Sequence, residues 1–225
     1  MEPAMADFST IRDLKQKLIR KPLAGAVLLA PYATVLPTKY FIGATSDLTD
    51  LKTAGFMSIG HVSKENAPTF TPEVETSEVE AWGLLESARM DMISRKTTIA
   101  WTGLETHKLN LELWSNADLS NVKYDATTGE TAYADPVEPS ITYRRAVFLS
   151  VDGAGANRIY MIRECPKFSV TEVGEQQLNQ ESAIEYPITG RAFVDDVAGY
   201  SMRYIFGGPG WKALAADAGF EAATP

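Results

Sequence analysis

The chain has 225 residues, of which 45% are hydrophobic and 22% are charged. This is the composition of an ordinary globular protein, and it excludes wholesale disorder, collagen and coiled coil. The 21 basic and 29 acidic residues give a net charge of −8, so a basic surface that wraps nucleic acid is not expected. The longest apolar run, residues 24–31, is much shorter than the ~20 residues that span a bilayer. We therefore expect a soluble protein that is made inside the cell and has no membrane partner.

Residues 1–21 have the pattern of an arm that precedes a single domain, residues 22–225. Ile11, Leu14 and Leu18 recur at helical spacing, and Pro22 ends the pattern, which predicts a short amphipathic helix. Isolated helices below ~12–15 residues are marginal in water. The apolar stripe of the arm therefore needs a surface to dock on, in its own chain or in a neighbour.

Strand patterns dominate the rest of the chain. They cover residues 23–30, 56–64, 69–76, 90–93, 97–101, 141–151, 156–165, 168–173, 183–194 and 200–206. Glycine, proline, asparagine and aspartate separate these segments at short intervals, which predicts a β-sandwich or barrel. The sequence Asp152-Gly153-Ala154-Gly155 is typical of a hairpin turn.

Two segments depart from the strand pattern. Residues 107–114 follow Thr106, a possible helix N-cap, but leucines at 109, 111 and 113 alternate as in a strand, so the residues leave helix and strand both open. Near the C-terminus, Pro209 at a first-turn position and Gly219 at the end predict a helix that buries Trp211 and Leu214. Residues 120–140 are polar and read as a long loop.

The residues offer little catalytic chemistry. Cys165 has His61 and His107 as possible bases, but it lies in an apolar strand before Pro166, which favours a buried structural thiol over a nucleophile. The two histidines lack the spacing of a metal pair. Four tryptophans, Trp82, Trp101, Trp114 and Trp211, suggest core packing more than a sugar-binding platform. We expect no catalytic residues, no metal and no cofactor.

Charge is unevenly distributed along the chain. Six glutamates and no basic residue lie between Lys64 and Arg89, whereas residues 1–40 carry six basic and three acidic groups. Opposite charges on different segments suit head-to-tail association of identical subunits; the alternative is an ordinary fluctuation of a solvated surface. Within the acidic run, Glu73, Glu75, Glu78 and Glu80 follow strand spacing. The parity shifts between Glu75 and Glu78, which predicts a bend or bulge near residues 76–77.

Several strings, taken in order, resemble the major tail protein of long-tailed, non-contractile bacteriophages. They are residues 75–83 (ETSEVEAWG), 89–94 (RMDMIS), 97–98, 105–106, 169–175 (SVTEVGE), 185–189 (EYPIT) and 206–214 (FGGPGWKAL). The resemblance extends over roughly residues 20 to 220. It implies a mainly β fold, with two packed sheets forming a partly open β-barrel or sandwich, a flanking helix at residues 107–114 and the C-terminal helix.

The resemblance also implies a function, which is assembly. Subunits of this family form hexameric rings that stack into the tail tube of the virion, assembled in the host cytoplasm around a tape-measure protein and closed by a tail terminator. DNA later passes without specific binding. A basic lumen would bind phosphates cumulatively, so an acidic chain suits this conduit.

From this we expect the face of Glu73, Glu75, Glu78 and Glu80 to line the lumen or to form a ring-to-ring contact, and the arm residues Ile11, Leu14 and Leu18 to act in assembly. Two alternatives are a carbohydrate-binding β-sandwich and another ring-forming tail component, such as a tail terminator or distal tail protein.

Overall fold

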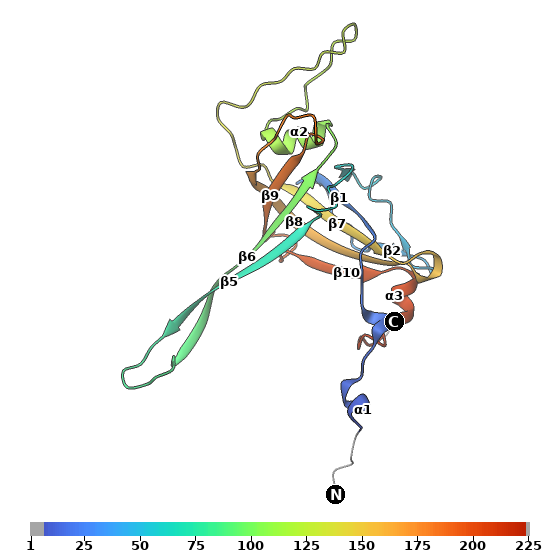
Figure 1. Cartoon of the computed structure of the whole chain (residues 1–225), viewed down its shortest axis with the longest axis vertical. Helices are drawn as coiled ribbons and strands as arrows, with labels where there is room; N and C mark the ends of the chain where they lie inside the picture. Colours follow the sequence, from blue (N-terminus) through green and yellow to red (C-terminus); the bar gives the residue numbers. More distant parts are fainter. Residues whose placement is uncertain (1–6, 224–225) are drawn as a thin grey trace, which may run out of the picture.

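The computed structural model describes residues 7–223 and shows a mainly β chain in which a long hairpin and an N-terminal arm project from a central body (Figure 1). The elements are α1 (Phe8–Arg12), η1 (Gln16–Leu18), β1 (Ala24–Pro31), β2 (Phe41–Ile42), β3 (Asp47–Leu48), β4 (Met57–Ser58), β5 (Thr69–Val79), β6 (Arg89–Gly103), α2 (Lys108–Ser115), β7 (Arg144–Asp152), η2 (Gly155–Asn157), β8 (Ile159–Val173), β9 (Tyr186–Phe193), β10 (Arg203–Gly207) and α3 (Pro209–Leu214). Within the described residues, no helix has the length and hydropathy needed to cross a membrane.

The main sheet has eight antiparallel strands and bends at β8. Its order is β4-β1-β7-β8-β9-β6-β5, with β10 also paired to β8, while β2 and β3 form a separate two-stranded sheet. β8 pairs with β7 and β10 through its N-terminal part and with β9 from Lys167 onward. A first half-sheet (β4, β1, β7, β10 and the N-terminal part of β8) and a second half-sheet (the C-terminal part of β8, β9, β6 and β5) therefore share one strand.

The main core lies between these two half-sheets. The Trp101 ring on β6 lies 5.6 Å from the Phe148 ring on β7 and 5.5 Å from the Phe168 ring on β8, measured between ring centroids. All three side chains are buried, and such aromatic contacts add to the free energy of burial. The expected mainly β fold with two packed layers is confirmed. The layers are halves of one continuous sheet, and the strands do not close into a barrel.

Two pairs of predicted strands prove to be single long strands. Segments 90–93 and 97–101 form β6, and segments 156–165 and 168–173 form β8. Pro166 lies inside β8 beside a register shift, at the point where β8 changes partner from β7 to β9. A proline without an N–H is tolerated where the hydrogen-bond ladder is interrupted. By contrast, of the predicted strand 56–64 the structure contains only β4 and an isolated β-bridge at Val62.

The open choice at residues 107–114 is resolved as a helix. α2 flanks the sheet with Leu109 and Leu113, one turn apart, both buried. The His107 side chain, rather than Thr106, caps the helix by accepting a hydrogen bond of 3.2 Å from the Leu109 N–H. The helix implied by the resemblance is thus confirmed, and the period-two leucines do not indicate a strand here.

The prediction that the four tryptophans pack in the core holds only in part. Trp101 is buried, and Trp114 is half-buried against the core. The predicted burial of Trp211 and Leu214 is wrong, because both are only half-buried in α3, where Trp211 stacks on Phe206 of β10 at 5.0 Å between ring centroids. The prediction that Trp82 packs in the core is wrong, because its side chain is fully exposed at the tip of the β5–β6 hairpin. An apolar neighbourhood in the sequence does not reveal that a hairpin carries these residues away from the body.

Candidate assembly surfaces

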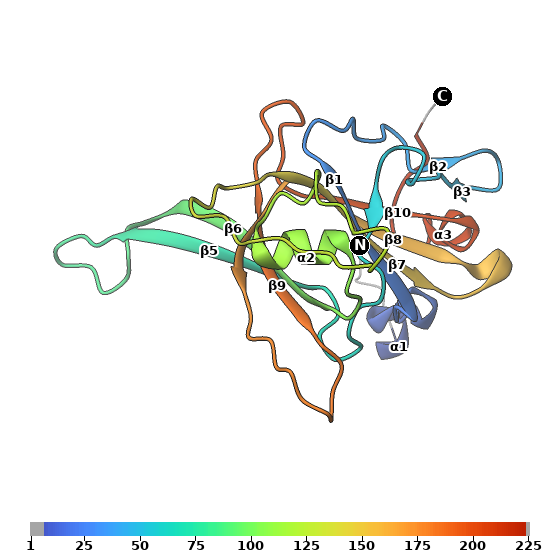
Figure 2. The ribbon, with the colours of Figure 1, turned by 90° about the horizontal axis from the view of Figure 1, so that it is seen from above.

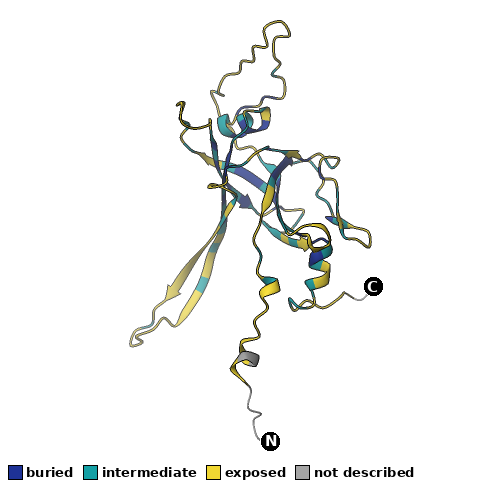
Figure 3. Cartoon of the chain, turned by 45° about the vertical axis from the view of Figure 1, so that its right-hand side comes forward, coloured by how far each residue is buried: buried dark blue, intermediate teal, exposed yellow. Residues whose placement is uncertain are grey.

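The distal part of the β5–β6 hairpin, residues 73–96, forms a two-stranded ribbon outside the body. β9 covers β6 only from Thr97 to Gly103 among the described residues, so β5 and β6 beyond that point pair with each other alone. Figures 1 and 3 show this ribbon projecting with its residues largely exposed. A lone hairpin is marginally stable in water, so the ribbon depends on its continuity with the sheet or on a covering surface.

The ribbon has a polar face. Glu73 is opposite Lys96 and Glu75 is opposite Ser94, whose hydroxyl donates a hydrogen bond of 3.1 Å to the Glu75 carboxylate. Directly opposed residues of an antiparallel pair lie on the same face. Toward the body, this face continues with Thr71 and with other small polar residues on β6 and β9. Their register positions alternate with those of the core residues, so their side chains lie on the face of the sheet opposite the core.

The other face of the ribbon is partly apolar and carries Glu78. The register shifts between Glu75 and Thr76, next to the predicted position, but the extra residue is Ile93 on β6 and β5 itself carries no insertion. Strand alternation then places Glu78 on the face of Val74, away from Glu73 and Glu75. Glu78 is opposite Met90, and Val74 and Met90 are both at least half exposed. The four predicted glutamates, Glu73, Glu75, Glu78 and Glu80, are all exposed but do not share one face, and Glu80 follows the end of β5.

The N-terminal arm does not form the single helix that its spacing predicts. α1 ends at Arg12, and Asp13 adopts a left-handed conformation with φ of 36° before η1 begins. Ile11 and Leu14 are about two-thirds exposed, while Leu18 is half-buried. The structure therefore does not bring these three residues onto one buried stripe.

The basic residues of the arm dock it to its own chain. Lys17 forms an ion pair with Asp217, and the Lys15 ammonium donates to the Asp217 carbonyl at 3.1 Å. At the base of the arm, Arg20 lies 3.2 Å from the Asp152 carboxylate. Lys15, Lys17 and Arg20 thus face the body, whereas Ile11 and Leu14 are exposed to solvent.

The second half-sheet has two open strand edges, whose positions the sequence did not reveal. Within residues 7–223, β5 pairs on one side only, with β6, and β8 beyond Phe168 pairs on one side only, with β9. Each strand of this half-sheet is antiparallel to the next, so β5 and β8, at its two ends, run in opposite directions. Unpaired backbone donors and acceptors on such edges can pair with another chain.

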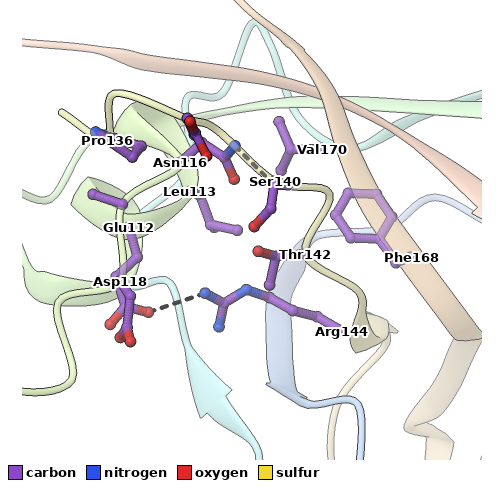
Figure 4. Close-up of a pocket in the computed structure, with 12 residues that line it drawn as sticks. Glu112, Leu113, Asn116, Asp118, Pro136, Ser140, Thr142, Arg144, Phe168 and Val170 are labelled. Carbon is purple, nitrogen blue, oxygen red and sulfur yellow. Dashed lines mark hydrogen bonds and ion pairs between the residues drawn. The ribbon is translucent and has the colours of Figure 1, made fainter.

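A cavity of about 390 Å³ lies beside α2, under the loop that leads to β7 (Figure 4). Leu113 and Phe168 are among the residues that line it, and Arg144 pairs with Glu112 at 3.1 Å. The lining contains no cysteine or histidine. Elsewhere, burial raises the pKa of the Cys165 thiol to about 12, so this thiol is protonated and unreactive at neutral pH. No cluster of metal-ligating side chains occurs in the described part of the chain.

Two buried carboxylates tie loops to the body. Glu164 on β8 accepts hydrogen bonds from Tyr40, from Tyr200 at 2.6 Å and from Arg203 at 2.9 Å. Asp195 accepts from Tyr32 at 2.8 Å, from Arg145 at 2.6 Å and from the Ala198 N–H at 2.7 Å. Buried charges of this kind require full pairing, and here both hold the segments around residues 32–40 and 195–203 in place.

Residues 14–205 match the model of a family described as phage tail tube protein. The chain belongs to the phage tail tube protein family. It is therefore a structural component of the phage tail tube, located in the virion, and the family is not one of enzymes. No curated protein matches the sequence. Among solved structures, a chain from the virion of a native gene transfer agent particle is similar at 12% identity, with a TM-score of 0.36, over 70% of this chain and 92% of that chain.

Proposed function

We propose that this tail tube protein assembles into rings through the two open edges of its second half-sheet, and that the rings stack into a conduit for DNA. One observation carries the proposal: β5 and the C-terminal part of β8 are both unpaired on their outer sides and run in opposite directions. β5 of one subunit can then pair with residues 169–173 of the next in the same antiparallel manner as within the subunit. Repetition around an axis pairs every such edge, which removes the hazard of open strands.

The number of subunits in the ring follows from the resemblance, which implies six. The contact joins two different edges and is therefore heterologous, and a heterologous contact generates a closed ring when its rotation closes. The same resemblance supports a tape-measure protein in the lumen before DNA and a tail terminator at the end of the tube. In this arrangement, residues 22–225 form the tube domain, and residues 1–21 form the arm.

The polar face of the second half-sheet is the surface that we assign to the lumen. It carries Glu73 and Glu75 on the ribbon and Glu172 opposite Thr189 on β8 and β9, together with Lys96 and Arg191. Mixed charges with an acidic excess do not accumulate phosphate contacts, so DNA can slide past. The opposite face of the ribbon, with Val74, Met90 and Glu78, is then left for a protein contact, and we assign it, with Glu80, to a neighbouring subunit.

Negative-stain electron microscopy of the purified full-length chain at high concentration tests this function. The expected result is rings with six-fold symmetry or tubes. A monodisperse monomer at every concentration would contradict the proposal. If, in addition, sugars quenched the tryptophan fluorescence of that monomer, the carbohydrate-binding alternative would be favoured instead.

A further inference from the structure

An exposed aromatic patch lies on β10, α3 and the C-terminal segment. We define it by four side chains: Tyr204, Phe206, Trp211 and Phe220. The Trp211 ring lies 5.0 Å from Phe206 and 6.0 Å from Phe220 between ring centroids. Tyr204, Phe206 and Phe220 are each at least about two-fifths exposed. A contiguous set of exposed aromatic side chains marks an interaction site more often than a free surface.

Two cations, Arg163 and Lys212, lie beside this aromatic patch. The Arg163 guanidinium lies 4.0 Å from the Phe70 ring centroid and 5.7 Å from the Tyr204 ring centroid. Lys212 is exposed on α3, and its ammonium donates a hydrogen bond of 2.8 Å to the Ala44 carbonyl. Asp217, the carboxylate close to α3, is already paired with Lys17. Among the described residues of the C-terminal segment this leaves Glu221 as the other acidic group. The chemistry of the patch therefore fits an apolar segment that carries carboxylates.

The tip of the ribbon, residues 80–88, has this composition. Trp82 and Leu85 are fully exposed. Glu80 and Glu86 flank them, and the tip contains no basic residue. In Figures 1 and 2 the ribbon tip and α3 lie on opposite sides of the body. A tip of one copy can therefore reach the patch of another copy in a repeating head-to-tail contact.

We propose that the ribbon tip of one subunit docks on the aromatic patch of a second copy of this chain, with Trp82 as its anchor and Glu80 and Glu86 facing Arg163 and Lys212. Tryptophan is enriched among the residues that dominate binding energy, and carboxylates pair well with arginine and lysine at the rim of such contacts. This contact rests on the proposed self-assembly and names two surfaces through which it occurs.

The first test compares Trp82→Ser with Val197→Ser, because both residues are almost fully exposed but Val197 lies outside both surfaces. Tube formation is followed by sedimentation and electron microscopy, and thermal melts confirm the fold. We expect Trp82→Ser to raise the protein concentration needed for tubes at least about 10-fold, and Val197→Ser to leave it unchanged. If both variants assemble like the parent, the tip contact is wrong, although the proposed function stands.

The second test uses charge reversal and rescue. Glu80→Lys with Glu86→Lys is expected to impair assembly, and a further Lys212→Glu is expected to restore part of it. Lys123→Glu, at an exposed lysine in the loop after α2, is the matched control and should restore nothing. Equal rescue by both changes, or no rescue by Lys212→Glu, would overturn the pairing of tip and patch. If the parent itself forms neither rings nor tubes, the proposed function fails and this contact fails with it.

Discussion

Glu73 on β5 and Lys96 on β6 occupy directly opposed positions of the hairpin, on its polar face. Opposite charges at such positions attract each other. The acidic run that dominates residues 65–88 is therefore partly balanced by the returning strand, since residues 73–96 contain six carboxylates and three cations. The polar face remains acidic in excess, but less so than the linear sequence indicates.

Reversing the charge of the polar face should affect DNA passage rather than assembly. In Glu73→Lys with Glu75→Lys, we expect tubes to form normally and DNA ejection to slow, because a basic lumen holds phosphates. Added salt should relieve the defect by screening the attraction. Ejection rates from virions that carry the variant, measured at low and high salt, check this. A parental rate at low salt would remove these residues from the lumen.

Reversal on the other side of the ribbon should have the opposite outcome. We expect Glu78→Lys with Glu80→Lys to abolish or strongly reduce polymerisation, because that face is assigned to a subunit contact. Sedimentation of the purified variant measures this, with the Glu73 and Glu75 variant as its matched control. Normal assembly and normal ejection in both variants would leave the glutamates as a solvated outer surface.

Deletion of residues 2–19 should leave a folded subunit that polymerises poorly. Within the described residues, the deleted segment contacts the body mainly through Lys15 and Lys17 at Asp217, whereas the ion pair between Arg20 and Asp152 is retained. The exposed Ile11 and Leu14 are lost, and with them the apolar surface that we expect to meet a neighbour. A thermal melt close to that of the parent, together with poor sedimentation, is the expected result. Unchanged polymerisation would show that the arm has no role in assembly.

The tryptophans of the core and of α3 should differ in their effect on stability. Trp101→Ala removes a buried ring between Phe148 and Phe168 and should cost about 3–5 kcal/mol of unfolding free energy. Trp211→Ala removes a half-buried ring from the aromatic patch and should cost only about 1–2 kcal/mol. Denaturant unfolding of the monomeric subunit measures both. Equal losses of unfolding free energy in the two variants would show that α3 is as essential to the fold as the main core.

Asp195 should contribute to the pH dependence of stability. Burial favours a higher pKa for this carboxyl, but the hydrogen bonds from Ala198, Tyr32 and Arg145 outweigh it and lower the pKa to about 2. The ionised form is therefore favoured in the folded state, so its contribution is complete above the ordinary pKa of about 4 and is lost as the pH falls toward 2.

Asp195→Asn tests this contribution. The substitution should cost about 3–5 kcal/mol at neutral pH, because it removes the carboxylate partner of the largely buried Arg145 guanidinium, which keeps only the Thr34 and Pro166 carbonyls as acceptors. In the parent, the contribution of Asp195 to the unfolding free energy is lost between about pH 4 and pH 2, and the variant should not show this loss. Identical pH profiles for the two proteins would contradict the assigned pKa.

The sequence predicts the strands well where apolar residues face a core and poorly where they do not. The interval 94–96 (Ser-Arg-Lys) breaks the apolar pattern, yet β6 runs through it because backbone pairing with β5 needs no apolar side chains. Pro166 likewise ends a predicted strand, although β8 continues through a change of partner. Asp13, whose left-handed conformation divides the arm, carries no distinctive spacing signal.

The assembly surfaces are harder to find than the elements. Period-two spacing places the glutamates on a strand and predicts that Glu73 and Glu75 differ in parity from Glu78, because alternation is a local property of a strand. The free edge of β8 depends on where β7 begins, at Arg144 opposite Phe168, and the exposure of Trp82 depends on how far the ribbon extends beyond β9. Both follow from pairing between segments far apart in the chain, which a single sequence does not display.

Hydrogen–deuterium exchange on assembled tubes and on free subunits tests most directly whether the two sheet edges join. The account predicts that the outward-facing amides of β5 and of residues 169–173 exchange rapidly in the free subunit and become protected in the tube, while the loop at residues 120–140 serves as an internal reference. Protection is expected in both segments together, because each edge is the partner of the other. Tubes in which both segments exchange as fast as in the free subunit would contradict the account.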